Sequence, residues 1–281
     1  MTLRIAAVQL LPTIGEVDAN VSRAVGHVRG AATAGAQLIV LPELATTGYV
    51  FESRDEASSL AEPIPEGPTS AALAELTAEL EVYLVIGMAE RCGDSLYNSA
   101  AVFGPTGYMG LFRKVHLWDN ENTIFKPGNL GFPVFSTPVG RLGVMICYDA
   151  WFPESYRSCA LAGAQIVCIP TNWVPIPGQD PASQAMATVL CMASAHCNGV
   201  VVVAADRIGV ERGQPFIGQS TIVSHTGWPI AGPASADQEE VLYADIDLEV
   251  SRAHRRWNRF NDPLLDRRPD SYSLTLLDDA S

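Results

Sequence analysis

Short runs of purely apolar residues are the feature that most constrains the fold of this chain. The segments LIVLP at 38–42 and VVVVAA at 200–205 contain no polar residue. Because side chains alternate between the two faces of a strand, a strand of this kind must be covered on both sides. The sequence therefore predicts sheets that lie inside the molecule, with other layers packed against both faces.

Further strand patterns alternate with helical patterns for most of the chain, which is typical of βα repetition. Strands are expected at 4–10, 36–43, 81–90, 98–105, 141–149, 164–172, 199–209, 218–225 and 241–248, and helices at 17–34, 66–80, 153–163 and 180–198. The segment GPTG at 104–107 and the stretch 224–233 predict hairpins. We therefore expect an α/β protein that combines parallel strands with hairpins.

A single domain spanning 1–281 is the expected organisation. The chain contains no linker rich in Gly or Ser, no internal repeat and no low-complexity segment. The tail 250–281 is rich in charge and interrupted by proline, so it cannot form a core alone. We expect it to act as a C-terminal arm used in dimer packing, with Trp257 and Phe260 as apolar anchors, and we predict a homodimer or higher homo-oligomer.

The charge balance argues against several kinds of partner. Lys and Arg number 18 against 31 Asp and Glu, which gives a net charge of −13. Nucleic acid and anionic membranes are not expected as partners, because both bind clustered basic residues. No apolar run approaches the roughly 18 residues needed to span a bilayer. The N-terminus does not resemble a signal peptide, so a cytoplasmic location is predicted.

The six cysteines are too few and too irregularly spaced for a disulfide framework, and we expect reduced thiols. Cys191, His196 and Cys197 lie close together, but their segment predicts a core helix and supplies no fourth ligand at zinc-site spacing. No metal site is therefore predicted. The absence of G-x-S-x-G and G-x-G-x-x-G motifs argues against a serine α/β-hydrolase and a dinucleotide enzyme.

Four polar residues follow or flank predicted strands. Glu43 ends LIVLPE, Cys147 ends GVMIC, and Lys114 and Glu121 belong to FRKVHLWDNE. Taken singly, the cysteine is most often a small core residue and the charged residues are most often solvated. In α/β folds, however, strand ends face the cleft where ligands bind, so these four side chains are candidates for one site.

Together the four residues provide the parts of a nucleophilic site. A thiol attacks a carbonyl or nitrile carbon as the thiolate and needs a base or cation beside it. Glu43 can take the proton, while Lys114 can lower the thiol pKa and stabilise an oxyanion with the backbone N–H of Tyr148. Glu121 can hold Lys114 in place.

Three motifs resemble the nitrilase superfamily of carbon–nitrogen hydrolases, whose catalytic residues are Glu, Lys and Cys in that order. They are LIVLPELATTGY, FRKVHLWDNE and GVMICYDAWFPES. The segments ADRIGVERGQPFIGQS and FNDPLLDRRPDSY are also similar to later parts of the family, so the resemblance runs the full length. It implies a four-layer αββα sandwich with the site between the sheets, dimers that pack into eight layers, and no metal or organic cofactor.

The resemblance also implies residue roles. The four catalytic residues are Glu43 as general base and acid, Lys114 as oxyanion stabiliser, Cys147 as nucleophile and Glu121 as positioning glutamate. The implied substrate-binding residues are Tyr148, Asn172, Trp173 and Tyr49. The expected reaction is hydrolysis of an amide to a carboxylic acid and ammonia through a cysteine thioester.

Residues after the cysteine discriminate between branches of the family. True nitrilases tend to carry Trp-Glu there, and this chain has Tyr148-Asp149. Carbamoylases of free amino acids usually place arginines at the positions that are 150–152 here, where Ala, Trp and Phe cannot pair a carboxylate. The sequence thus favours a small neutral amide as substrate. A small nitrile is the alternative, since CYDAWFPES also resembles members described as nitrilases, and an N-carbamoyl amide is a further one.

Two other classes of function fit less well. A binding protein on an inactive hydrolase scaffold would be free to lose one of the four site residues, and all four are present. An acyltransferase would pass the acyl group from Cys147 to an amine, but the membrane-bound transferases of the family carry transmembrane helices that this sequence lacks.

Overall fold

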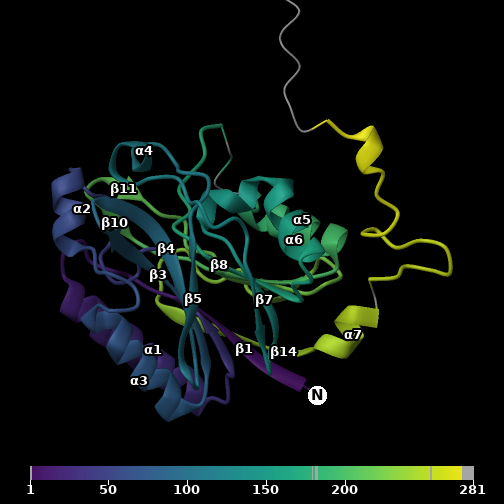
Figure 1. The fold of residues 1–281 in the computed structure, drawn as a ribbon, viewed down its shortest axis with the longest axis horizontal. Coiled ribbons are helices and arrows are strands. Elements are labelled where there is room, and N and C mark those ends of the chain that lie inside the picture. Colours follow the sequence, from purple (N-terminus) through teal and green to yellow (C-terminus); the bar gives the residue numbers. More distant parts are fainter. Residues whose placement is uncertain (1, 179, 181–182, 254, 274–281) are drawn as a thin grey trace, which may run out of the picture.

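Two six-stranded sheets form the centre of the computed structural model, which describes residues 2–178, 180, 183–253 and 255–273. The sheets lie face to face, and helices cover their outer sides (Figure 1). Neighbouring residues in the apolar strands divide between two cores. Ile5 and Ala7 belong to the core that includes both sheets, whereas Ala6 and Val8 pack in a second core beneath the helices of the first sheet. The αββα sandwich expected for this single domain is confirmed.

The first sheet has the strand order β14-β1-β2-β3-β4-β5. These strands are β14 (Glu240–Asp247), β1 (Thr2–Gln9), β2 (Leu38–Val40), β3 (Tyr83–Cys92), β4 (Ser95–Gly104) and β5 (Gly107–Arg113). The central strands β1, β2 and β3 are parallel, and antiparallel strands flank them. The hairpin expected around GPTG is present as the β4–β5 pair.

The second sheet repeats this plan with the order β13-β12-β9-β8-β7-β6. Its strands are β13 (Pro229–Ala231), β12 (Thr221–Val223), β9 (Val201–Ala205), β8 (Ile166–Pro170), β7 (Gly140–Val144) and β6 (Val134–Thr137). The central strands β7, β8 and β9 are parallel, and β12 and β13 form the second predicted hairpin. A separate short ribbon pairs β10 (Val210–Glu211) with β11 (Gln214–Pro215).

The helices form the two outer layers. Helices α1 (Val17–Thr33) and α3 (Pro68–Leu80) cover the first sheet, and α5 (Pro153–Leu161) and α6 (Met186–Asn198) cover the second (Figure 1). The remaining helices are α2 (Arg54–Leu60), α4 (Glu121–Ile124), α7 (Leu248–Ala253) and two short 3₁₀ helices, η1 (Cys147–Trp151) and η2 (Pro269–Ser271).

Several predicted boundaries shift, and several short elements, among them α2 and the strand β6, were not predicted. The strand predicted at 141–149 ends at Val144, because the chain turns into η1 at Cys147. The helix predicted at 180–198 begins only at Met186, and residues 179, 181 and 182 lie outside the described residues. Helix α2 was not predicted. Its seven residues are too few for a clear helical period, and its single buried residue is Ala57.

Candidate active site

The ends of the parallel strands bring the predicted site residues to one edge of the sandwich. Glu43 lies shortly after β2, Lys114 directly after β5, Cys147 after β7 and Asn172 after β8. Carboxyl ends of neighbouring parallel strands meet at one edge of a sheet. Because the two sheets face each other, residues from both edges converge on one place.

Lys114 lies between two carboxylates in the interior. Its Nζ is 2.6 Å from Oε1 of Glu43 and 2.8 Å from Oε2 of Glu121. The side chains of Lys114 and Glu43 are both 0% exposed. Burying an ammonium this deeply is costly unless it is paired with such carboxylates. Lys114, Glu43 and Glu121 therefore depend on one another for their charges and positions.

Asn98, at the fourth position of β4, contacts both carboxylates and was missed by the sequence analysis. Its Nδ2 donates to Oε1 of Glu43 at 2.6 Å and to Oε1 of Glu121 at 2.8 Å. The available signal was an amide at the first position of the strand predicted at 98–105, where a buried polar group requires a partner. The other oxygen of Glu43, Oε2, is buried and has no hydrogen-bond partner within the described ranges.

The environment of Glu43 tunes its acidity. Burial raises the pKa of this carboxyl to about 7, with Lys114 opposing the rise and Glu121 adding to it. Burial works against the charged form of Lys114, but the charges of Glu121 and Glu43 hold the pKa of this ammonium above its usual value. A carboxyl that titrates near neutrality can both accept and return a proton.

Cys147 occupies a sharp bend at the entrance to η1. Its φ is 44°, a left-handed conformation that is costly for a residue with a Cβ and that often marks a functional site. Asp149 stabilises the bend, because its Oδ2 accepts from the backbone N of Ile146 at 3.2 Å. Its Oδ1 accepts from the backbone N of His116 at 2.9 Å and lies 2.7 Å from the imidazole Nδ1. Asp149 thereby joins the cysteine bend to the segment that carries Lys114.

The thiol of Cys147 differs from the expectation in one respect. Burial raises its pKa well above the usual value and Glu43 adds to the rise, whereas Lys114 lowers it by less. Lys114 therefore lowers the thiol pKa as expected, but its effect is smaller than the combined effect of burial and Glu43. Cys147 rests as a thiol, and its activation requires a base.

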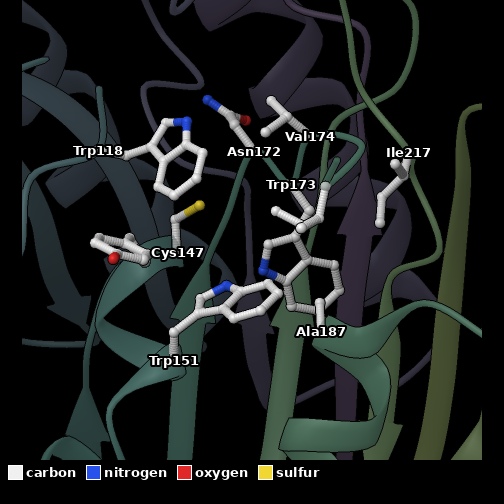
Figure 2. A pocket seen from close by; sticks show the side chains of 10 residues that line it. Trp118, Cys147, Trp151, Asn172, Trp173, Val174, Ala187 and Ile217 are labelled. Atoms are coloured by element: carbon white, nitrogen blue, oxygen red, sulfur yellow. The ribbon is translucent and has the colours of Figure 1, made fainter. Parts of the chain in front are cut away.

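A cavity lies in front of Cys147. Figure 2 shows three indole rings around it, those of Trp118, Trp151 and Trp173. The complete lining is Trp118, Cys147, Tyr148, Trp151, Asn172, Trp173, Val174, Ile176, Ala187 and Ile217. The predicted substrate-binding residues Tyr148, Asn172 and Trp173 therefore all face it, and the lining contains no Lys or Arg.

Tyr49 does not line this cavity, contrary to expectation. It lines an adjoining one with Glu121 that shares Trp118 and Val174 with the first. Burial raises the pKa of the Tyr49 hydroxyl well above its usual value, and the nearby charges of Glu121 and Glu43 raise it further. The sequence order placed Tyr49 near Glu43 but could not show on which side of Trp118 it would lie.

Asn172 has a fixed orientation beside the nucleophile. Its Nδ2 donates to the backbone oxygen of Glu43 at 2.9 Å. Since a carbonyl only accepts, this contact sets the amide orientation and leaves Oδ1 facing away from that carbonyl. Oδ1 is buried and finds no partner in the described part of the chain, so it can accept an N–H from a ligand.

The described residues contain no group of three or more His, Cys, Asp or Glu side chains that could hold a metal ion. Cys191 is buried in α6 with its sulfur 3.6 Å from the Tyr156 hydroxyl, and Cys197 is exposed. Within the same ranges, no helix is both long and apolar enough to cross a bilayer.

Comparison with known proteins agrees with this geometry. The family model described as carbon-nitrogen hydrolase matches residues 4–256. The chain belongs to the carbon–nitrogen hydrolase family. It is 45% identical to a nitrilase of Pyrococcus abyssi over 270 residues, which cover 96% of this chain and 99% of the relative. It is 36% identical to an N-carbamoylputrescine amidase of Solanum lycopersicum, with 99% and 96% of the two chains covered.

The solved structures agree as well. The crystal structure of a carbon-nitrogen hydrolase from Helicobacter pylori matches with a TM-score of 0.85 and 31% identity, covering 96% of this chain and 97% of that one. The predicted membership of the nitrilase superfamily and the predicted hydrolase activity are thus confirmed at the level of the family.

Proposed function

We propose that this carbon–nitrogen hydrolase cleaves a small neutral amide to a carboxylic acid and ammonia, with Cys147 as the nucleophile. The observation that carries the proposal is the buried contact of Lys114 with Glu43 and Glu121 behind the bend that presents Cys147. Glu43, Lys114 and Cys147 thereby supply a base, a cation and a thiol in one buried site.

In the first half of the reaction, Glu43 accepts the proton of Cys147 as sulfur bonds to the amide carbon. The free Oε2 of Glu43 is the oxygen available for this proton. The resulting oxyanion lies against Lys114 and the backbone N–H of Tyr148, which is at the start of η1, where backbone N–H groups lack helical partners. Glu43 then gives its proton to the departing nitrogen, the carbon–nitrogen bond breaks, and ammonia leaves a thioester on Cys147.

Water completes the second half of the reaction. Glu43 takes a proton from the water as its oxygen bonds to the thioester carbon. The carbon–sulfur bond then breaks, and the proton returns to the sulfur of Cys147, which regenerates the enzyme. Glu121 keeps Lys114 in place during both halves of the reaction, while Glu43 accepts and returns the proton.

The cavity favours a neutral substrate. No cationic side chain lines it, and the only ammonium behind it is already held by two carboxylates. A substrate carboxylate would be buried without a partner. This agrees with the apolar residues at 150–152 and disfavours N-carbamoyl amino acids that carry a free carboxylate.

Two alternatives use the same residues. A nitrile would form a thioimidate on Cys147, and the similarity to the Pyrococcus abyssi nitrilase supports testing it. An N-carbamoyl amine would place its ureido carbon at the same position, and its N–H could donate to Oδ1 of Asn172. The similarity to the Solanum lycopersicum amidase supports this test.

The first experiment is ammonia release from a panel of simple amides, nitriles and N-carbamoyl compounds, combined with mass spectrometry of the intact protein. Turnover of amides with an acyl adduct that disappears in Cys147→Ala is the expected result. Cys159→Ala is the matched control, because Cys159 is also buried but lies in α5 outside the cavity. Turnover of nitriles alone would move the enzyme to the alternative class, and full activity of Cys147→Ala would refute the mechanism.

A further inference from the structure

The indole N–H of Trp173 is a buried donor in the cavity that has no protein partner. Trp173 is 3% exposed and lines the cavity in front of Cys147. Its Nε1 finds no acceptor among the residues that the structure describes. A buried N–H without a partner is unfavourable, so in a ligand cavity it marks a contact that a ligand completes.

The backbone holds this indole in place from both sides. The N–H of Trp173 donates to Oδ1 of Asp206 at 2.9 Å, and its carbonyl oxygen accepts from the backbone N of Ile217 at 3.0 Å. In Figure 2 the indole nitrogen lies on the edge of the ring nearer to Trp151 and Cys147. The donor therefore lies on the side of the cavity next to Cys147, where the acyl group of a substrate would lie.

The surrounding charges decide which acceptor fits this donor. The cavity lining contains no Lys or Arg, and the ammonium of Lys114 already donates to Glu43 and Glu121. A carboxylate beside the indole would lack a cation and would be costly to bury. A neutral oxygen, such as that of an ether, a ketone or a second carboxamide, has no such cost.

We propose that Trp173 is a specificity-determining residue whose Nε1–H binds a neutral hydrogen-bond acceptor on the acyl chain of the substrate. The inference rests on the proposed function, since it places the acyl group in this cavity. It defines the substrate class more narrowly, as a small neutral amide with a second polar atom near the scissile carbonyl.

The test compares two amides of equal size, methoxyacetamide and butyramide, which differ by one oxygen in place of a methylene group. The ratio of their kcat/KM values is measured in the wild type and in Trp173→Phe, which keeps an aromatic ring but lacks the donor. We expect the ratio to fall roughly three- to tenfold, the range for loss of one neutral hydrogen bond. The intrinsic reactivity of the two amides cancels in this comparison.

Trp151→Phe is the matched control, because its indole lines the same cavity but is not among the buried unpaired groups. We expect this variant to change the ratio by less than about twofold. An unchanged ratio in Trp173→Phe, or an equal change in both variants, would overturn the inference while leaving the hydrolase function intact.

A second measurement separates the inference from the proposed function and does not depend on the folding of Trp173→Phe. The indole N–H resonances of the protein are followed by NMR in Cys147→Ala while each amide is added. A downfield shift of the Trp173 resonance with methoxyacetamide, but not with butyramide, supports the inference even if neither amide is turned over. Equal responses to the two amides refute it.

Discussion

At the scale of a single residue, Asn98 contributes to the acidity of Glu43. Its amide donates to both Glu43 and Glu121, and its contact with Glu43 lowers the pKa that burial raises to about 7. If Glu43 is the base, kcat/KM should fall about tenfold per pH unit below that pKa, because the protonated carboxyl cannot accept the thiol proton.

Replacing Asn98 by Leu removes the donor at similar size. The pKa of Glu43 should then rise further, so the acid limb of the kcat/KM profile should move to higher pH. Ser99→Ala is the control, since Ser99 is the next residue on β4 but donates to Glu90 instead. We expect its acid limb to match that of the wild type. A limb that stays in place in Asn98→Leu would show that Glu43 is not the titrating base.

Strand β3 positions Glu43 through a close approach at Gly87. A Cβ at this position would lie 2.4 Å from Cα of Glu43 and 2.6 Å from the oxygen of Pro42. The backbone also bonds there, since Ala45 donates to the oxygen of Gly87 and Gly87 donates to the oxygen of Pro42. At the scale of the element, only glycine lets the two segments approach this closely.

Gly87→Ala should therefore displace Glu43 without removing any catalytic group. We expect a loss of stability of about 1–3 kcal/mol and a loss of kcat/KM of at least about tenfold, because overpacking shifts the backbone. Urea unfolding and steady-state kinetics measure the two effects. Gly26→Ala in α1 is the control, since its Cβ would meet nothing within 4 Å, and we expect it to stabilise the helix by roughly 0.5–1 kcal/mol.

A buried ion pair holds the loop that carries Tyr49. Arg207 is 1% exposed, and its Nη1 lies 2.8 Å from Oε1 of Glu211. Oε2 of Glu211 accepts from the backbone N of Tyr49 at 2.7 Å and of Val50 at 2.6 Å. The pair thus connects the end of β9 and β10 to the wall of the second cavity.

Arg207→Ala should cost about 3–5 kcal/mol of unfolding free energy, because Glu211 would stay buried without its cation. Arg4→Ala removes an ion pair with Asp245 whose distance is similar, 2.9 Å, but both side chains there are about half exposed. We expect that control to cost about 0–1 kcal/mol. Equal costs in the two variants by urea unfolding would contradict the assignment of the buried pair.

At the scale of the whole molecule, the C-terminal arm leaves apolar residues uncovered. After α7 it runs along the outer side of the sandwich beside α5 and α6, where Trp257 stacks on His196 and the carbonyl oxygen of Pro263 accepts from Arg157 (Figure 1). Exposed large side chains along it include Trp257, Phe260, Leu265 and Tyr272. Phe260 and Leu265 are 80% and 82% exposed, which is more than expected for an arm folded on its own domain alone.

We propose that the arm packs against a second copy of the chain, as predicted from the sequence. Sedimentation equilibrium at micromolar protein should give the mass of a homodimer, and a chain truncated after Ala253 should shift toward the monomer. A monomeric full-length protein would refute the proposal. Residues 274–281 of the predicted arm lie outside the described residues.

The sequence by itself determined the layers of this protein. Runs such as those at 38–42 and 200–205 are apolar on both faces, so only a covered sheet satisfies them, and the three motifs indicated the family. Glu43, Lys114 and Cys147 were likewise predicted, together with the cavity residues Tyr148, Asn172 and Trp173, since strand ends and local motifs are encoded in consecutive residues.

Only the tertiary structure decided what depends on contacts between distant segments. Asn98 reaches Glu43 and Glu121 across 55 and 23 positions of sequence, which no local pattern encodes. The net rise of the Cys147 pKa reflects burial, which arises only when the two sheets close over the thiol. The indole N–H of Trp173 is likewise left without a partner by the folded surroundings. Residue type alone does not show whether a hydrogen-bond donor finds an acceptor.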